Sequence, residues 1–200
     1  MNFEINNENI EKSFSIVATD IMNNWILKTN EISYRICELE FYYKSDSHQD
    51  PYIHGHELQK QMGKWYFHGS GLDLTFGSEG ISGSILIRAI YNLDEEKYIY
   101  GPLNTVTELL SNLPGIYGGD FSLQFEQDNK GKIKSEDKIK SIEAPRVGLS
   151  PEKDNKDKFC KKNYRFLVMP KNKHIGKESL MAEMALNGKS KEEIKTYWSR

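Results

Sequence analysis

Two acidic residues and a tyrosine alternate along one extended segment, and their spacing gives them a common face. Glu38, Glu40 and Tyr42 share the same parity, so their side chains point to the same side of a sheet. A carboxylate in such a place can take a proton from water and stabilise developing positive charge. The alternative is two acids exposed to solvent, which is where glutamate most often lies.

An arginine and a group of histidines could add further chemistry. Arg88 interrupts an otherwise apolar strand pattern, so it is either a buried guanidinium that binds an anion or a residue at a sheet edge. His54 and His56 would place two imidazoles on one strand face. Zinc could use their nitrogens together with those of His48 and His68. The chain lacks a cysteine pair, an HExxH helix and an acidic ligand at a diagnostic spacing, so we expect loop histidines, no metal and no cofactor.

A lysine-rich stretch over residues 130–162 could contact phosphate. Its lysines alternate with glutamate and aspartate, which favours a solvated loop. The functional alternative is contact with a nucleic-acid backbone, where each basic side chain releases a counterion. The basic residues concerned are Lys130, Lys132, Lys134, Lys138, Lys140, Lys161, Lys162 and Arg165.

The pattern along the chain predicts the elements that must hold these residues. Apolar residues recur every three or four positions over 8–25, which indicates a helix. Alternation over 32–43 indicates a strand with a bulge near Cys37. The other expected elements are strands over 64–68, 72–76, 84–91, 121–125 and 164–169, a helix from Pro102 to Leu113, and a C-terminal helix with a capping box of Ser190 and Glu193. This mixture without regular βαβ alternation favours an α+β fold.

The composition limits the classes of protein that the chain can form. Its 200 residues are 38% hydrophobic and 12% aromatic, which suffices for a folded core. A net charge of −2 excludes a generally basic nucleic-acid coat, and the lack of an apolar run of about 18 residues excludes a membrane span. The first residues show no secretory-signal pattern. Cys37 and Cys160 lie far apart, so we expect reduced thiols and a cytoplasmic protein.

Five short blocks follow one another in the order of a known family. They are Arg35–Tyr42 (RICELEFY), Ile85–Ala89 (ILIRA), Gly101–Leu110 (GPLNTVTELL), Arg146–Leu149 (RVGL) and Tyr164–Leu167 (YRFL). In this order they resemble the segments R-I-V-E-T-E-A-Y, V-L-L-R-A, G-P-x-K-L-x-x-A-L, R-V-G-V and L-R-F-Y of the alkyladenine (3-methyladenine) DNA glycosylase family. With Ala18–Leu27 laid over the family's L-A-R-x-L-L-G-x-x-L-V segment, the resemblance covers residues 18–168.

The resemblance implies a role for each matched residue. Glu40 would activate the water that attacks the sugar, and Arg88 would lie beside that water and the sugar phosphate. The residues implied in substrate binding are Tyr42, His48, Tyr66, His68 and Asp73. Since no lysine nucleophile is indicated, the implied reaction is hydrolysis without a lyase step. The alternative for Tyr42 and Tyr66 is an ordinary place among the core aromatics.

Two departures from the family pattern bear on the partner. The segment Trp65–Gly71 stands where the family has the aromatic hairpin Y-x-Y-I-I-Y-G, and it is several residues shorter, without an evident wedge tyrosine. Because Gly69 and Gly71 flank Ser70, we expect a short hairpin with no aromatic side chain projecting beyond the pocket rim. Asp73 stands where the family's M-N-I-S segment has asparagine, so an acid replaces an amide. These departures weaken the case for duplex DNA more than the case for the fold.

Together these features predict one α+β domain over residues 1–175 and a helical tail over 176–200. The family resemblance implies a curved, mostly antiparallel and partly barrel-like sheet with peripheral helices. The implied activity is hydrolysis of the N-glycosidic bond of alkylated or damaged purines in base-excision repair, with the base flipped into the pocket. The expected partner is damaged DNA, single-stranded DNA or RNA being alternatives, and no membrane is involved. The side chains expected on the nucleic-acid backbone are Arg146, Lys161, Lys162 and Arg165.

Two other functions fit the same fold. One is a non-catalytic module that binds a nucleotide or single-stranded nucleic acid, which the shortened hairpin and Asp73 favour. The other is an N-glycosidase that acts on a small nucleoside, which suits a mildly acidic chain. The combination of Glu40 with Arg88 favours an enzyme.

Overall fold

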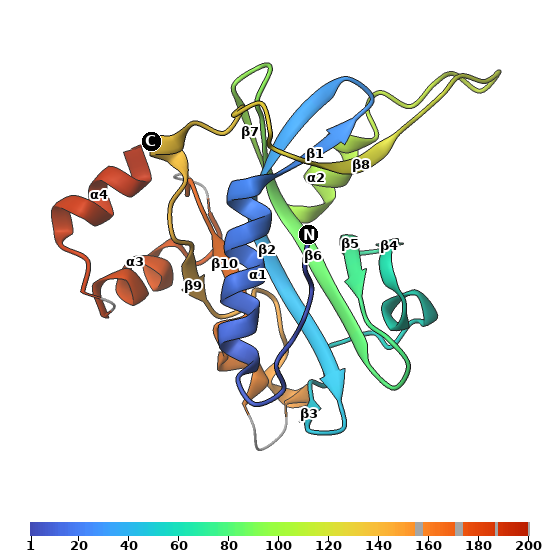
Figure 1. Ribbon diagram of the computed structural model, residues 1–200. Coiled ribbons are helices and arrows are strands. Elements are labelled where there is room, and N and C mark those ends of the chain that lie inside the picture. The colour runs from blue at the N-terminus through green and yellow to red at the C-terminus, as the bar shows by residue number, and fades with distance from the viewer. Residues whose placement is uncertain (155–157, 171–173, 187, 200) are drawn as a thin grey trace.

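A curled antiparallel sheet forms the centre of the protein (Figure 1). The computed structural model describes residues 1–154, 158–170, 174–186 and 188–199. Its strands are β1 (Trp25–Thr29), β2 (Ile32–Ser45), β3 (His48–Gln49), β4 (Met62–His68), β5 (Gly71–Phe76), β6 (Ser82–Asn92), β7 (Lys97–Tyr100), β8 (Leu123–Gln127), β9 (Ile142–Ala144) and β10 (Arg165–Leu167). Within the described residues the main path of the sheet runs β4-β5-β6-β2-β1-β8. The short strands β3 and β10 pair with β2, β7 pairs with β6, and β9 pairs with β10.

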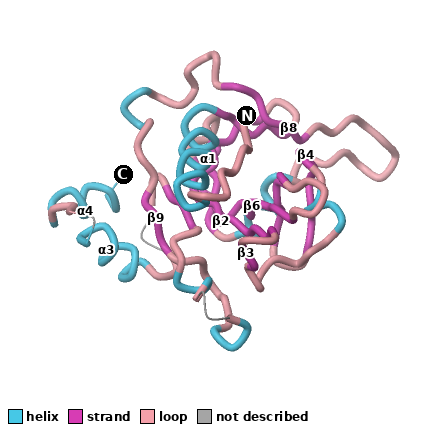
Figure 2. The backbone as a smooth tube through the Cα atoms, turned by 60° about the horizontal axis from the view of Figure 1, so that its bottom comes forward, coloured by secondary structure: helices cyan, strands magenta, loops and turns pink. Residues whose placement is uncertain are grey.

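Helices surround this sheet, as the α+β expectation requires. The α-helices are α1 (Ile10–Asn24), α2 (Pro102–Leu109), α3 (Lys177–Leu186) and α4 (Lys191–Ser199). The single turns of 3-10 helix are η1 (Glu57–Lys60), η2 (Ser135–Asp137), η3 (Pro151–Lys153) and η4 (Phe159–Lys161). Helix α1 crosses the sheet over β2, whereas α3 and α4 lie beyond β9, in both views (Figures 1 and 2).

The two longest strands, β2 and β6, pair along nearly their whole length. Their register joins Ile36 to Ile90 and Leu39 to Ile87. Between these pairs the ladder is irregular on both sides of Glu38, so the bulge predicted near Cys37 is confirmed. Irregular pairing at this point lies directly beside the residues of the candidate site.

Helix α1 packs its apolar face on the odd-numbered residues of β2. Asn9 caps its start by accepting the Lys12 amide, 3.2 Å away. The Phe14 ring stacks on Phe41 with 4.3 Å between ring centroids and meets Tyr164 edge-on at 4.9 Å. All three rings are at most 1% exposed, and each contributes about 1.5–3 kcal/mol by leaving water. The α1 face of the sheet is thereby closed, and the even-numbered residues of β2 face the other side.

The C-terminal residues 176–200 were expected to form a helical tail, and within them the structure has the two helices α3 and α4. Leu180, Met184, Ile194 and Trp198 are buried in a second apolar cluster with Ile142, Ala144 and Leu167 of β9 and β10. The predicted capping box is confirmed, because Glu193 accepts the Ser190 amide at 2.8 Å and Ser190 accepts the Glu193 amide at 3.2 Å. These helices therefore pack on the sheet that carries the site.

Several other expectations are confirmed and others differ. The strands expected at 64–68, 72–76 and 84–91 are β4, β5 and β6. The strand expected at 121–125 lies two residues later as β8, and that expected at 164–169 is the shorter β10. The sequence pattern missed β1, β3, β7 and β9, and it predicted one C-terminal helix where the structure has α3 and α4. The helix from Pro102 ends at Leu109 rather than at Leu113. Among the described residues, no helix combines the length and apolar character that crossing a membrane requires.

Candidate active site

A cavity of about 550 Å³ opens on the face of the sheet opposite α1. Four residues implied by the family resemblance line it, namely Tyr42, His68, Asp73 and Arg88. His54 and the backbone around Val147 contribute to the same wall. The structure therefore brings together residues from β2, β4, β5 and β6 and from the loop after β9.

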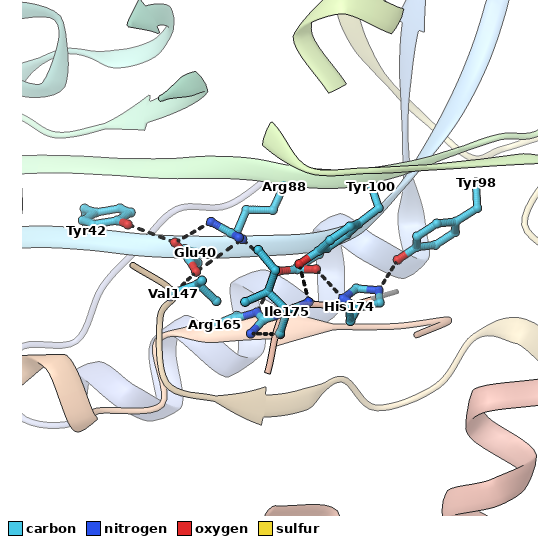
Figure 3. Close-up of polar contacts among 10 residues, drawn as sticks. Glu40, Tyr42, Arg88, Tyr98, Tyr100, Val147, Arg165, His174 and Ile175 are labelled. Atoms are coloured by element: carbon cyan, nitrogen blue, oxygen red, sulfur yellow. Dashed lines mark hydrogen bonds and ion pairs between the residues drawn. The ribbon is translucent and has the colours of Figure 1, made fainter. Parts of the chain in front are cut away.

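Glu40 lies beneath this wall and is fully buried. Its Oε1 accepts the Val147 amide at 2.8 Å, and its Oε2 accepts the Tyr42 hydroxyl at 2.9 Å (Figure 3). Arg88 adds its charge, with Nε 3.3 Å from Oε1 and Nη1 donating to Oε2 at 3.4 Å. Burial raises the pKa of Glu40 above its ordinary value, although the Arg88 charge and the Val147 hydrogen bond act in the opposite direction. Glu40 is thus a carboxyl group that favours taking up a proton.

Glu38 is the second buried carboxylate, and its contacts differ from those of Glu40. Its Oε1 accepts from Arg88 Nε at 2.8 Å and from Arg165 Nε at 2.7 Å. Its Oε2 lies 2.9 Å from Nδ1 of His174. Burial opposes ionisation, but the contact with His174 and the charges of Arg165 and Arg88 outweigh it and lower the pKa of Glu38 to about 2. The solvent-exposed alternative for this pair of acids is therefore wrong.

The strand order explains why these charges meet. In the register of the sheet, Arg165 of β10 lies opposite Glu40 of β2. On the other side of β2, the pairs Ile36–Ile90 and Leu39–Ile87 bracket Glu38 and Arg88. Three adjacent strands thus present alternating acids and arginines on one face. Because Arg88 lies in the central strand β6 and is 5% exposed, it is a buried arginine that binds anionic groups and not an edge residue.

Asp73 and His68 form a polar pair in the pocket wall. His68 Nε2 lies 2.9 Å from Asp73 Oδ1, and its Nδ1 accepts the Ser70 amide at 3.2 Å. Because Nδ1 must accept, the proton of the neutral ring lies on Nε2 and is donated to Asp73. This arrangement aligns the Asp73 carboxylate at the pocket, where it can accept hydrogen bonds from a ligand.

Tyr66 belongs to an aromatic cluster beside the pocket. Its ring stacks on His56 at 4.6 Å and on His68 at 4.9 Å, and its hydroxyl lies 3.2 Å from His54 Nδ1. Burial, followed by the nearby His68, lowers the pKa of His54, which favours the uncharged ring. In the part of the chain that the structure describes, no group of three or more His, Cys, Asp or Glu side chains is placed to hold a metal ion.

The short hairpin expected before Asp73 is present. His68 pairs with Gly71 across β4 and β5, so Gly69 and Ser70 form the turn. Phe67 is 47% exposed, but its parity is opposite to that of Tyr66 and His68, so it points away from the pocket side. This aromatic side chain is therefore not a wedge at the pocket rim.

His48 does not contribute to the pocket. Its ring is buried on the α1 side of the sheet, where Nδ1 lies 2.9 Å from the Tyr43 carbonyl and Nε2 lies 2.8 Å from the Tyr164 hydroxyl. The Phe159 ring meets it edge-on at 4.8 Å. Burial lowers the pKa of His48. The implied substrate contact is wrong, since both ring nitrogens have partners within the protein.

The expected contact with a nucleic-acid backbone is wrong for both arginines. Arg146 is 5% exposed and forms a bidentate pair with Asp50, at 2.6 and 3.1 Å. Its guanidinium lies 4.5 Å from the centre of the Tyr42 ring. Arg165 is 2% exposed and pairs with Glu38. These guanidinium groups support the site from below and are not presented to a phosphate at the surface.

The two lysines that were also expected at the nucleic-acid backbone, Lys161 and Lys162, are more exposed than the two arginines. Lys161 is exposed, and Lys162 is partly exposed with its Nζ 3.5 Å from Glu11. Lys153 is exposed as well and lies at the pocket itself. Among the residues that the structure describes, the positive charge that a nucleic acid could reach therefore comes from lysines.

Sequence reasoning missed three residues of the buried network, namely Tyr98, Tyr100 and His174. Tyr98 hydroxyl lies 2.9 Å from His174 Nε2, and the Tyr100 ring lies 4.3 Å from the His174 ring. Tyr98 and Tyr100 share one parity in a strand that the pattern did not predict, and His174 belongs to no motif. The alternation Tyr98-Ile99-Tyr100 is the one signal that could have pointed to this strand.

Comparison with known proteins finds a similar viral protein. No protein-family model matches this sequence. An uncharacterized protein of Acanthamoeba polyphaga mimivirus is 28% identical over 193 residues, which cover 79% of this chain and 87% of that protein. The similarity thus extends over most of both chains.

Proposed function

We propose that the protein hydrolyses the N-glycosidic bond of alkylated or damaged purine nucleotides, with Glu40 as the general base. The observation that carries this proposal is the Glu40 carboxyl group, held by Arg88, the Val147 amide and Tyr42 beside a cavity of about 550 Å³. The reaction needs an acceptor for a proton of water and negative charge near the sugar as its bond to the base breaks. A buried carboxylate next to an arginine supplies both.

The carboxyl groups of Glu38 and Glu40 have different roles in the proposed reaction. Neighbouring acids whose environments push their pKa values apart are typical of acid–base sites. Here the pKa of Glu38 is lowered to about 2, whereas that of Glu40 is raised by burial. Glu38 therefore stays ionised and holds the arginines, and Glu40 exchanges the proton.

The pocket wall suits a flat, polar base. Tyr42 and His68 offer aromatic surface on which a flipped base can stack. The Asp73 carboxylate, aligned by His68, accepts N–H groups at the edge of such a base. Arg88 lies at the same wall, where its charge favours the phosphate and the departing electron pair.

Damaged nucleic acid is the proposed partner, in duplex or single-stranded form. The exposed Lys153 and Lys161 and the partly exposed Lys162 supply contacts for the backbone. A net charge of −2 gives little general attraction, so binding should be weak and should depend steeply on salt. The short hairpin without a wedge favours a base that is already unpaired or weakly paired.

One observation favours a second function, a non-catalytic module that binds nucleotides or single strands. Glu40 is 0% exposed and both of its oxygens accept hydrogen bonds from the protein. In a binding module, Glu40 anchors Tyr42 and the loop at Val147, and the pocket binds the base without cleaving its bond to the sugar.

Base release distinguishes these two functions. Alkylated duplex DNA, alkylated single-stranded DNA and alkylated RNA are incubated with the wild type, with Glu40→Gln and with a control, Glu31→Gln, whose side chain is 99% exposed. A general base contributes roughly 10²–10⁴-fold, so Glu40→Gln should lose release by that factor while the control keeps it. Binding without release by the wild type would establish the binding module. Release that is unchanged in Glu40→Gln would remove Glu40 from the mechanism and make Asp73 the next candidate base.

A further inference from the structure

We infer that His174 is a positioning residue for the candidate active site: it fixes Glu38, and Glu38 fixes Arg88 against Glu40. The inference rests on the proposed function for its effect on catalysis. It assigns a role to a residue near the C-terminus, far along the chain from the strands that form the pocket.

Both ring nitrogens of His174 lie close to a polar side chain. Nδ1 lies 2.9 Å from Glu38 Oε2 and Nε2 lies 2.9 Å from the Tyr98 hydroxyl (Figure 3). The ring lies 4.3 Å from that of Tyr100 and 6.0 Å from that of Trp198, and the residue is 5% exposed. Two polar contacts and two aromatic neighbours thus restrain the orientation of this ring.

The next residue fixes the backbone at the same place. The Ile175 amide donates to the Tyr100 hydroxyl at 2.8 Å. The Ile175 carbonyl accepts from both terminal nitrogens of Arg165, each at 3.3 Å. Arg165 thus joins the His174–Ile175 segment to Glu38, to which its Nε donates. The segment is attached to the network by side chain and by main chain.

The contacts then lead stepwise to Glu40. Glu38 Oε1 accepts hydrogen bonds from Arg88 and Arg165, and its Oε2 lies at ion-pair distance, 2.9 Å, from His174 Nδ1, so the carboxylate is contacted from both sides. Arg88 donates its Nε to Glu38, which turns Nη1 toward Glu40 at 3.4 Å. Without His174, Glu38 would depend on the two arginines alone, and Arg88 would move toward Glu38 and away from Glu40.

The charges around the network agree with this order of contacts. The charged and titratable groups that face the two acids or their direct partners are Arg88, Arg165, His174, Tyr42, Tyr98 and Tyr100. Burying two carboxylates is costly unless each is paired and hydrogen-bonded. Arg88 contacts both Glu38 and Glu40. A change in how closely Glu38 holds Arg88 therefore changes how well Arg88 stabilises the charge of Glu40.

The test compares three variants of the full chain with the wild type, and Glu40→Gln serves to assign a signal. One of its measurements, the titration of the Glu40 carboxyl, does not depend on activity. His174→Leu fills a similar volume without a donor. His174→Asn keeps an amide nitrogen close to the place of Nδ1, and Met184→Ala loosens the packing of α3 without touching the network. Each variant is assayed for kcat and KM on alkylated DNA. The Glu40 carboxyl is followed by ¹³C NMR across a pH titration, and the absence of its signal in Glu40→Gln assigns it.

For His174→Leu we expect a kcat lower by about 10²-fold with KM within about twofold, which is the size that a small misplacement of a catalytic group produces. We expect the Glu40 carboxyl to titrate at a higher pH, because Arg88 stabilises its charge less well. His174→Asn should restore both values most of the way, and Met184→Ala should lower Tm while leaving the Glu40 titration in place. If the leucine variant does not fold, Tyr98→Phe replaces it, and a smaller shift in the same direction is expected.

The two proposals can fail separately. A wild type that releases no base removes the proposed hydrolase, and the Glu40 titration still decides the role of His174. An unchanged Glu40 titration in the folded His174→Leu or Tyr98→Phe variant would overturn the inference. An equal shift in Met184→Ala would also overturn it, because the effect would then come from general loosening of the C-terminal helices.

Discussion

Arg165 of β10 and Glu38 of β2 form an ion pair inside the protein, with Nε 2.7 Å from Oε1. Their side chains are 2% and 0% exposed, so neither group exchanges this partner for water. Breaking a buried pair leaves a charge without compensation, which costs more than the loss of a surface pair. The pair therefore links the stability of the fold to the ionisation of one acid.

Stability should fall in acid because of Glu38. Its pKa is lowered from 4.5 to about 2 in the folded protein, so the unfolded chain binds the additional proton between these values. The stabilisation, about 3 kcal/mol, is complete above pH 5 and is lost as the pH falls through about 2. Denaturant unfolding between pH 2.5 and about 7 measures it. Glu38→Gln should flatten this part of the profile, and an unchanged slope would show that other acids carry it.

Arg146 should matter for stability and not for nucleic-acid affinity. Its bidentate pair with Asp50 is buried on both sides, so Arg146→Met leaves a buried carboxylate without its partner and should cost about 3–5 kcal/mol. Urea unfolding measures the loss. The double variant Arg146→Met with Asp50→Leu removes both charges and should recover much of it. A folded Arg146→Met protein whose slope of log K against log salt is lower by about 0.7–0.9 would restore the phosphate contact expected from the sequence.

Lysines should determine how binding depends on salt. Lys161 is exposed, and replacing one phosphate contact lowers the slope of log K against log salt by about 0.9 for duplex and about 0.7 for single strands. Fluorescence titrations of Lys161→Gln at several salt concentrations give this slope. Lys130→Gln, also exposed but in the loop beyond β8, serves as the control. Equal slopes for wild type and Lys161→Gln would place the nucleic acid elsewhere.

Asp73 should select bases that present N–H groups. Asp73→Asn keeps an oxygen for His68 but removes the charge that accepts a ligand's donor. Hydrogen bonds to charged groups contribute about 1.5–3 kcal/mol, so guanosine should bind at least about tenfold more weakly to the variant. A purine nucleoside without N–H groups on its base should bind both proteins alike. Calorimetry with the two nucleosides tests this, and a parallel loss for both would assign Asp73 to the fold.

Local patterns predicted much of the fold and part of the site. Alternation in 32–43 predicted β2, and the same parity that gave Glu40 and Tyr42 a common face brings the Tyr42 hydroxyl at the pocket wall onto the Glu40 carboxylate beneath it. The glycines around Ser70 predicted the short turn. These features depend on neighbours within a few residues, which a sequence shows directly.

The features that the sequence missed depend on distant parts of the chain. Nothing near Glu38 shows that Arg165 and His174 will enclose it, so its acidity suggested exposure. Arg146 was expected at a phosphate for the same reason, because its partner Asp50 lies 96 residues away. His48 stood among loop histidines in the sequence, yet the turn after β2 folds it under the α1 side of the sheet.

The distance along the chain between Glu38 and its arginine partners has a consequence for folding during translation. Arg88 follows Glu38 by 50 residues and Arg165 by 127, so β2 leaves the ribosome long before the chain that will enclose its acid exists. Until then the carboxylate keeps its hydration, and the centre of the sheet cannot close around it. Such long-range contacts also slow folding, because distant segments must meet before the contacts stabilise them. We therefore expect the middle of this sheet to be completed late. A chain that stops before Arg165 contains most of the strands, yet we expect it to remain unfolded, which its circular dichroism would show.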